Sequence, residues 1–144
     1  MKLDRNKAGK AFRNYVAQYN AQDEKVKLKI DHTYRVAALC EQIAQSISLS
    51  SDDVDIAWFS GLLHDVGRFE QLRRFGTFND AQSIDHAMYG AEILFDQEKI
   101  WDYIDREAIT EDELLFLRKV ISCHSAYRVP QDYTDREKQF ADIL

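Results

Sequence analysis

The chain has 144 residues and a net charge of −6 at neutral pH, with 45% hydrophobic residues, one proline and five glycines. This length fits one domain with its own core, and the composition is typical of a globular helical protein. No apolar run reaches the ~18 residues of a membrane span, the first residues lack the apolar core of a signal peptide, and the acidic charge disfavours nucleic-acid binding, so we expect a cytoplasmic protein without membrane or nucleic-acid partners.

The first two predicted helices cover residues 2–19 and 24–47. In the second, the larger apolar residues recur at helical spacing, and His32 falls on the same stripe. We expect this stripe to face the core and His32 to point inward with it. The stripe consists of Leu28, Val36, Leu39, Ile43 and Ile47.

A third helix is predicted over residues 52–66, with Ser50 as its N-cap and Gly67 as its C-terminal stop. His64 and Asp65 then lie in its last turn. One face of this helix carries almost no bulk, so another part of the protein must approach it closely. A second helix explains this face, and so does a metal site between helices. The small residues are Ala57, Ser60 and Gly61.

The remaining chain continues the helical pattern. Residues 69–80 form a basic and aromatic connector, predicted as a short helix and a loop. A further helix begins near Ser83 and carries His86 on its inward face. Thr110 and Thr134 each open a helix with a capping box, and His124 lies on the inward face of the first of these. Two cysteines, Cys40 and Cys123, are too few for a disulfide framework and are interpreted as buried thiols. We predict an all-α bundle of about six helices.

All four histidines of the chain fall on predicted inward faces of four different helices, and one is followed by an aspartate. A single buried histidine is more often a hydrogen-bonded core residue than a ligand, but four on separate helices indicate one shared centre. Imidazoles with a carboxylate suit one or two ions of Mn, Fe, Co, Ni or Zn, whereas Mg²⁺ prefers oxygen ligands. A ligand set without thiolates argues against a purely structural zinc site.

The order of these residues resembles the HD-domain superfamily of metal-dependent phosphohydrolases, over about residues 28–144. The stretch DHTYRVA at residues 31–37 is similar to the opening histidine helix of that family, and GLLHDVGR at residues 61–68 is similar to its signature. The resemblance implies that His32, His64 and Asp65 bind one metal ion. It also implies that His86 and His124 bind a second ion, with Asp65 bridging the two.

The family pattern ends with one more aspartate ligand, usually in a stretch such as R-D-A-D-K. Residues 140–144, FADIL, resemble the residues just before it. We therefore expect the domain of residues 1–144 to stop before this ligand, with Asp142, at the wrong place in the pattern, as the only candidate inside the chain. The pair His124-Ser125 replaces the doubled histidine with which some members bind a third metal, so we expect no trinuclear site.

The resemblance implies hydrolysis of a phosphate ester or anhydride in a small, nucleotide-like anion. It also implies that Asp65 and Arg68 are catalytic residues. The Arg68 guanidinium suits a phosphate oxygen or a bridging carboxylate, although a surface salt bridge explains it equally well. The motifs of guanosine tetraphosphate hydrolases and of cyclic-di-GMP phosphodiesterases are missing. Two basic side chains of the connector could close over a phosphate and three aromatic side chains could stack on a base or sugar, although solvation explains the first group and core packing the second. These are Arg73, Arg74, Phe75, Phe78 and Tyr127.

Two other functional classes fit the same residues. Di-iron oxygenases of the superfamily use this ligand set to cleave carbon bonds with O₂. A metal-poor regulatory or binding module is the other alternative, because the last aspartate ligand is missing. The oligomeric state is left open by the sequence.

Overall fold

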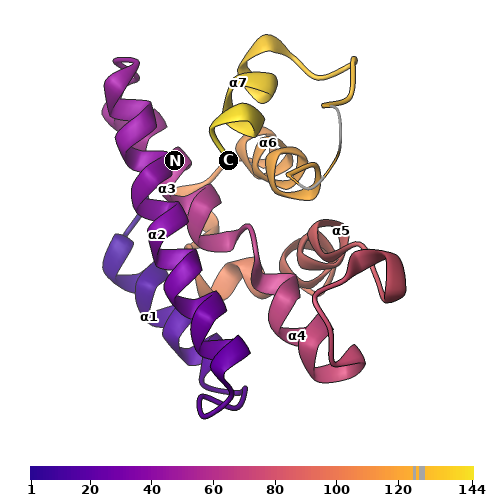
Figure 1. Ribbon diagram of the computed structural model, residues 1–144. Coiled ribbons are helices and arrows are strands. Elements are labelled where there is room, and N and C mark those ends of the chain that lie inside the picture. The colour runs from indigo at the N-terminus through magenta and orange to yellow at the C-terminus, as the bar shows by residue number, and fades with distance from the viewer. Residues whose placement is uncertain (125, 127–128) are drawn as a thin grey trace.

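The computed structural model describes residues 1–124, 126 and 129–144, and this part is all-α, as predicted (Figure 1). If helical segments that follow one another directly or nearly so are counted as one helix, the described residues form six helices, which is the predicted number. The α-helices are α1 (Arg5–Val16), α2 (Glu24–Ser46), α3 (Ser51–Leu63), α4 (Val66–Phe75), α5 (His86–Ala91), α6 (Glu111–Ser122) and α7 (Asp135–Ile143). Short 3₁₀ or π segments are η1 (Asp80–Gln82), η2 (Glu92–Asp96), η3 (Lys99–Asp102) and η4 (Arg106–Ala108).

Polar side chains set the starts of the helices as the sequence indicates. The Ser50 hydroxyl accepts the N–H of Asp53 at 3.2 Å at the start of α3. Thr110 and Thr134 both form the complete capping boxes that were predicted for α6 and α7. Each cap satisfies backbone donors that a helix start otherwise leaves unpaired.

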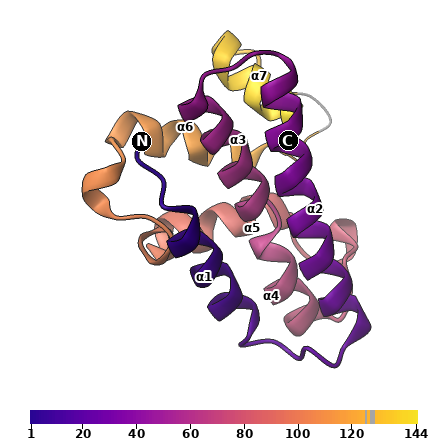
Figure 2. The ribbon, with the colours of Figure 1, turned by 90° about the vertical axis from the view of Figure 1, so that its left-hand side faces the viewer.

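The small face of α3 packs against a second helix, which was one of the two explanations of its composition. A Cβ added to Gly61 would lie 2.7 Å from Cα of Ala37 in α2, so only glycine allows this approach. Both ribbon views show α2 running alongside α3 (Figures 1 and 2). This contact brings His32 on α2 close to the end of α3.

The prediction that the large apolar residues of α2 face the core is wrong. The exposed fractions of Leu28, Leu39, Ile43 and Ile47 are 58%, 53%, 41% and 46%. Smaller side chains form the inward face, because two helix backbones that nearly touch leave little room for side chains as large as leucine or isoleucine. The buried residues of α2 are Val26, Thr33, Ala37, Cys40 and Ala44.

The predicted role of Gly67 as the stop of α3 is also wrong. Helix α3 ends at Leu63, and Gly67 lies inside α4. A Cβ at Gly67 would lie 2.4 Å from the backbone oxygen of His86 and 2.8 Å from the backbone nitrogen of Gly90. Glycine is therefore required for the contact between α4 and α5. His64 and Asp65 stand in the short break between α3 and α4.

The core lies between these helices in two clusters. The larger one joins α1, α3, α4 and α6 and contains Phe12, Phe59, Phe69 and Ile121. The smaller one lies beneath α7, around Phe140. Both cysteine thiols are buried and free, as predicted. No helix among the described residues is long and apolar enough to cross a membrane.

Replacing Gly67 with alanine should lower the free energy of unfolding by about 1–3 kcal/mol, because the new methyl group would press on the rigid backbone of α5. Gly9→Ala is the matched control, since its Cβ would meet only the end of the Arg13 side chain at 3.4 Å. The control should raise stability by up to about 1 kcal/mol through helix propensity. Urea denaturation measures both, and equal midpoints for Gly67→Ala and the wild type would contradict this packing.

Candidate metal centre

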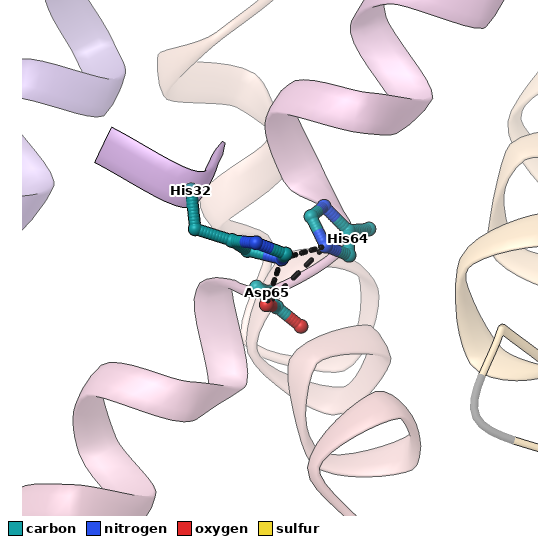
Figure 3. A group of neighbouring side chains, drawn as sticks. All are labelled: His32, His64 and Asp65. Carbon is teal, nitrogen blue, oxygen red and sulfur yellow. Dashed lines mark hydrogen bonds and ion pairs between the residues drawn. The ribbon is translucent and has the colours of Figure 1, made fainter. Parts of the chain in front are cut away.

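Three of the predicted ligands meet where α2 passes the break between α3 and α4. Figure 3 shows His32 reaching from α2 toward His64 and Asp65. The Nε2 atoms of His32 and His64 lie 3.3 Å apart. Oδ2 of Asp65 lies 3.3 Å from the first of these nitrogens and 3.2 Å from the second. These three atoms form a nearly equilateral triangle.

The other two histidines meet the second oxygen of the same carboxylate. His86 is the first residue of α5, and His124 follows the end of α6. Their Nε2 atoms lie 2.9 Å apart. Oδ1 of Asp65 lies 3.3 Å from His86 Nε2 and 3.4 Å from His124 Nε2. The structure thus brings all five predicted ligands together in two groups that share Asp65.

Asp65 is held as a buried anion, with 3% of its surface exposed. Burial alone raises the pKa of its carboxyl group, but hydrogen bonds from His124, His64 and His86 outweigh burial and lower the pKa below its usual range. Because a buried carboxylate is costly unless it is paired, the ring of imidazoles around Asp65 implies positive charge at this point.

Hydrogen bonds at the far side of two imidazole rings settle which nitrogen of each ring faces the cluster. Nδ1 of His64 lies 2.6 Å from the carbonyl oxygen of Gly61, and Nδ1 of His124 lies 2.8 Å from that of Ile121. Since a carbonyl oxygen only accepts, Nδ1 must be the donor in both rings. In the neutral ring, Nε2 then carries a lone pair that faces the cluster, as a metal ligand requires.

The spacing of the ligand atoms fits a transition-metal ion. Nitrogen and oxygen ligands lie about 2.0–2.2 Å from zinc, and at tetrahedral angles such atoms are separated by roughly 3.3 Å. The edges of the triangle formed by His32, His64 and Asp65 are 3.2–3.3 Å. Lone pairs directed at one another over these distances repel unless a cation or a proton lies between them. The donor set therefore fits the metal that it implies.

Asp80 is a functional residue that the sequence did not reveal. Its Oδ2 lies 2.7 Å from Nδ1 of His86 and thereby orients the third imidazole. Burial raises the pKa of Asp80, but hydrogen bonds from Gln71 and His86 outweigh burial and lower it to about 2. Asp80 lies in η1, outside the regular helices, so no helical periodicity links it to His86.

Arg68 lies behind this carboxylate. Its Nη1 donates to Oδ1 of Asp80 at 2.7 Å, to Oε1 of Gln71 at 2.8 Å and to the carbonyl oxygen of Phe78 at 2.6 Å. The side chain of Arg68 is 16% exposed and that of Asp80 is 31% exposed, so this ion pair is partly buried. Arg68 thus contacts a residue that orients a ligand.

Lys29 is a second residue that sequence reasoning missed. It lies one helical turn before His32 on α2, and its Nζ lies 3.2 Å from Oδ2 of Asp65. The same ammonium group lies 5.3 Å from the ring centre of Phe78. The sequence shows Lys29 one helical turn before His32, but this spacing does not indicate a functional role, because lysines are common on exposed helix faces.

The other suggested residues that the structure describes belong to neither ligand group. Arg73 forms an ion pair with Glu70, and Arg74 lies beside Tyr89. Phe75 is 40% exposed, whereas Phe78 lies under Lys29 and Arg68. Asp142 belongs to neither metal-type group among the described residues. Tyr127 lies outside the described residues.

Fold and site together define an all-α protein whose histidine–aspartate cluster can hold divalent metal ions. A family model described as HD domain matches residues 30–143, so the chain belongs to the HD domain family, as the resemblance of its motifs predicted. This places it in a superfamily of metal-dependent phosphohydrolases. No curated protein and no solved structure matches the chain significantly.

Replacing Asp80 with alanine should weaken binding of Mn²⁺ or Zn²⁺ by roughly 10- to 100-fold, because His86 would lose the acceptor that fixes its ring. Asp102→Ala is the matched control, since this exposed aspartate lies in η3 and outside both metal-type groups. Isothermal titration of metal-free protein measures both affinities. Equal affinity of Asp80→Ala and Asp102→Ala would show that Asp80 does not support the site.

Proposed function

We propose that this chain is a metal-dependent phosphohydrolase that acts on a phosphate ester or anhydride of a small, nucleotide-like anion. One observation carries the proposal: each oxygen of the buried Asp65 carboxylate faces its own pair of imidazole nitrogens. This arrangement suits two ions bridged by one carboxylate, which is a common design of enzymes that cleave phosphate bonds.

Each ligand has a separate task in this proposal. His32 and His64 hold one ion, His86 and His124 hold the other, and Asp65 bridges them. Bound divalent ions of Mn, Fe, Co, Ni or Zn supply a nucleophilic hydroxide near neutral pH and offset the charge of the phosphate. Asp65 also orients the water nucleophile, because its two oxygens lie between the two ligand pairs.

We assign phosphate binding to Lys29 and a positioning role to Arg68. The Lys29 ammonium already lies against the shared carboxylate, and its side chain is 18% exposed, so a substrate oxygen can reach it. Arg68 directs Nη1 to three acceptors of the protein, and this arrangement supports Asp80 and, through it, His86. The sequence suggested that Arg68 contacts the phosphate, but in this assignment it contributes to catalysis indirectly by holding Asp80.

The charge of the protein supports a small anion as the substrate. The net charge of −6 disfavours a large polyanion such as nucleic acid. A small anion meets only the local field of the metal centre and Lys29. Bound cations reverse the sign of the local potential and make such a substrate acceptable.

Phosphate release from a panel of nucleotides and from p-nitrophenyl phosphate, with Mn²⁺, Co²⁺ or Ni²⁺ present, tests the proposal. The wild type should be active with at least one of these ions, and Asp65→Asn should lower kcat to the level of free metal ions, because the bridge loses its charge. Lys29→Met should raise KM and retain the metal. Arg73→Ala is the control with unchanged activity, since this exposed side chain forms its ion pair with Glu70, outside both ligand groups of the described residues.

The rival functions give different results in the same experiment. A di-iron oxygenase would release no phosphate and would instead contain redox-active iron and consume O₂ with its substrate. A metal-poor binding module would bind none of the three ions at micromolar concentration. Either result, or hydrolysis that survives Asp65→Asn, would contradict the proposal.

A further inference from the structure

A second candidate site lies in a cleft of about 750 Å³ that none of the five metal-cluster residues lines. Its walls come from α1, from Glu70 of α4, and from the chain between α5 and Tyr103. Ligand-binding pockets commonly have volumes of ~300–1,000 Å³, so the cleft is large enough for a small organic molecule.

Tyrosine rings form one wall of the cleft and are held in place. The Tyr19 hydroxyl donates to Oε2 of Glu70 at 2.8 Å, and the Tyr15 hydroxyl donates to the carbonyl oxygen of Val66 at 2.8 Å. The two rings meet edge to face, with their centres 5.5 Å apart. Rings that are fixed at both ends offer a planar ligand an aromatic surface at little entropic cost.

Tyr103 also lines the cleft, and its hydroxyl lacks a hydrogen-bond partner among the residues that the structure describes. The residue is only 2% exposed. Burial, followed by the nearby Tyr15 and Asp102, raises the pKa of this hydroxyl, so it keeps its proton. Most buried donors in proteins are paired, and an acceptor atom of a bound molecule would satisfy this one.

Two lysines of the cleft, Lys10 and Lys99, are exposed and pair with no carboxylate in the described part of the chain. Lys7, by contrast, forms an ion pair with Asp105. Of the three lining carboxylates, Glu70 accepts from Arg73 and Tyr19, Asp4 caps α1, whose N-terminus offsets part of its charge, and Asp102 keeps its charge. The cleft therefore offers an anion two cations without a carboxylate partner, Lys10 and Lys99, although its lining lysines and carboxylates are equal in number.

We propose that this cleft binds a planar organic anion, with its ring against Tyr15 and Tyr19, its anionic group near Lys10 and Lys99, and an acceptor atom near the Tyr103 hydroxyl. The site is separate from the metal centre and does not depend on its activity. Affinity should require both ring and charge, because the tyrosines provide only an aromatic surface and the lysines provide only contacts to the anionic group.

The test is an NMR titration of the ¹⁵N-labelled whole chain with naphthalene-1-sulfonate, which a phosphohydrolase does not cleave. Naphthalene-1-sulfonamide has the same shape without the charge, and methanesulfonate has the anion without the ring. The first probe should bind at least tenfold more tightly than either of the others. It should shift amide signals of α1 and η3.

Two variants locate the binding. Lys10→Ala with Lys99→Ala should weaken binding of naphthalene-1-sulfonate at least tenfold, as expected for loss of charge-assisted contacts. Lys25→Ala with Lys27→Ala is the matched control, because these lysines are exposed on α2 and outside the cleft. Asn14→Trp should block binding by filling the cleft from an exposed position without removing charge.

Four outcomes would overturn the proposal. The first is no binding of naphthalene-1-sulfonate at millimolar concentration. The second is a set of shifts confined to the exposed apolar residues of α2, which a hydrophobic ring also attracts. The third is equal affinity of the sulfonate for both lysine double variants. Binding of the sulfonamide as tight as that of the sulfonate would likewise remove the role of the lysines.

Discussion

The structure depends on one buried carboxylate that must be compensated by cations. Asp65 lies among four imidazoles, and the hydrogen bonds behind His64 and His124 direct their Nε2 atoms toward it. Without an ion or protons at this point, the lone pairs of the imidazole nitrogens would face those of the carboxylate, and the Lys29 ammonium would offset the buried charge from one side only. The most economical explanation of five such groups in one place is a metal centre, and the HD family to which the chain belongs supports the same conclusion.

The surrounding fold serves to bring distant segments to this carboxylate. The break between α3 and α4 directs the buried side chains of His64 and Asp65 into the same cluster. Neighbouring residues of one continuous helix would point in different directions. Gly61 allows α2 to approach from one side, and Gly67 allows α5 to approach from the other. These backbone contacts place His32 and His86 within reach. The glycines therefore belong to the site, although neither contributes a side chain to it.

Much of this architecture could be predicted from local sequence. Caps such as Ser50 and Thr110 act on neighbouring residues, so their effect can be inferred without the tertiary structure. The face of α2 could not be predicted in the same way, because its close contact with Gly61 favours small residues over the larger apolar ones. The role of Asp80 was also hidden, since it depends on how η1 folds back toward α5. The order of the histidines and the adjacent His64-Asp65 pair identify the candidate ligands, whereas supporting groups in connections become visible only in three dimensions.

The most direct test of the central claim is the number of ions that the two ligand groups hold. Metal-free protein titrated with Mn²⁺ and followed by electron paramagnetic resonance should bind two ions per chain, and the ions should be magnetically coupled through the Asp65 bridge. Replacing His86 with alanine should leave one uncoupled ion at the group that contains His32. A chain that binds no Mn²⁺ specifically, or binds two ions whose coupling survives the loss of Asp65, would contradict the account.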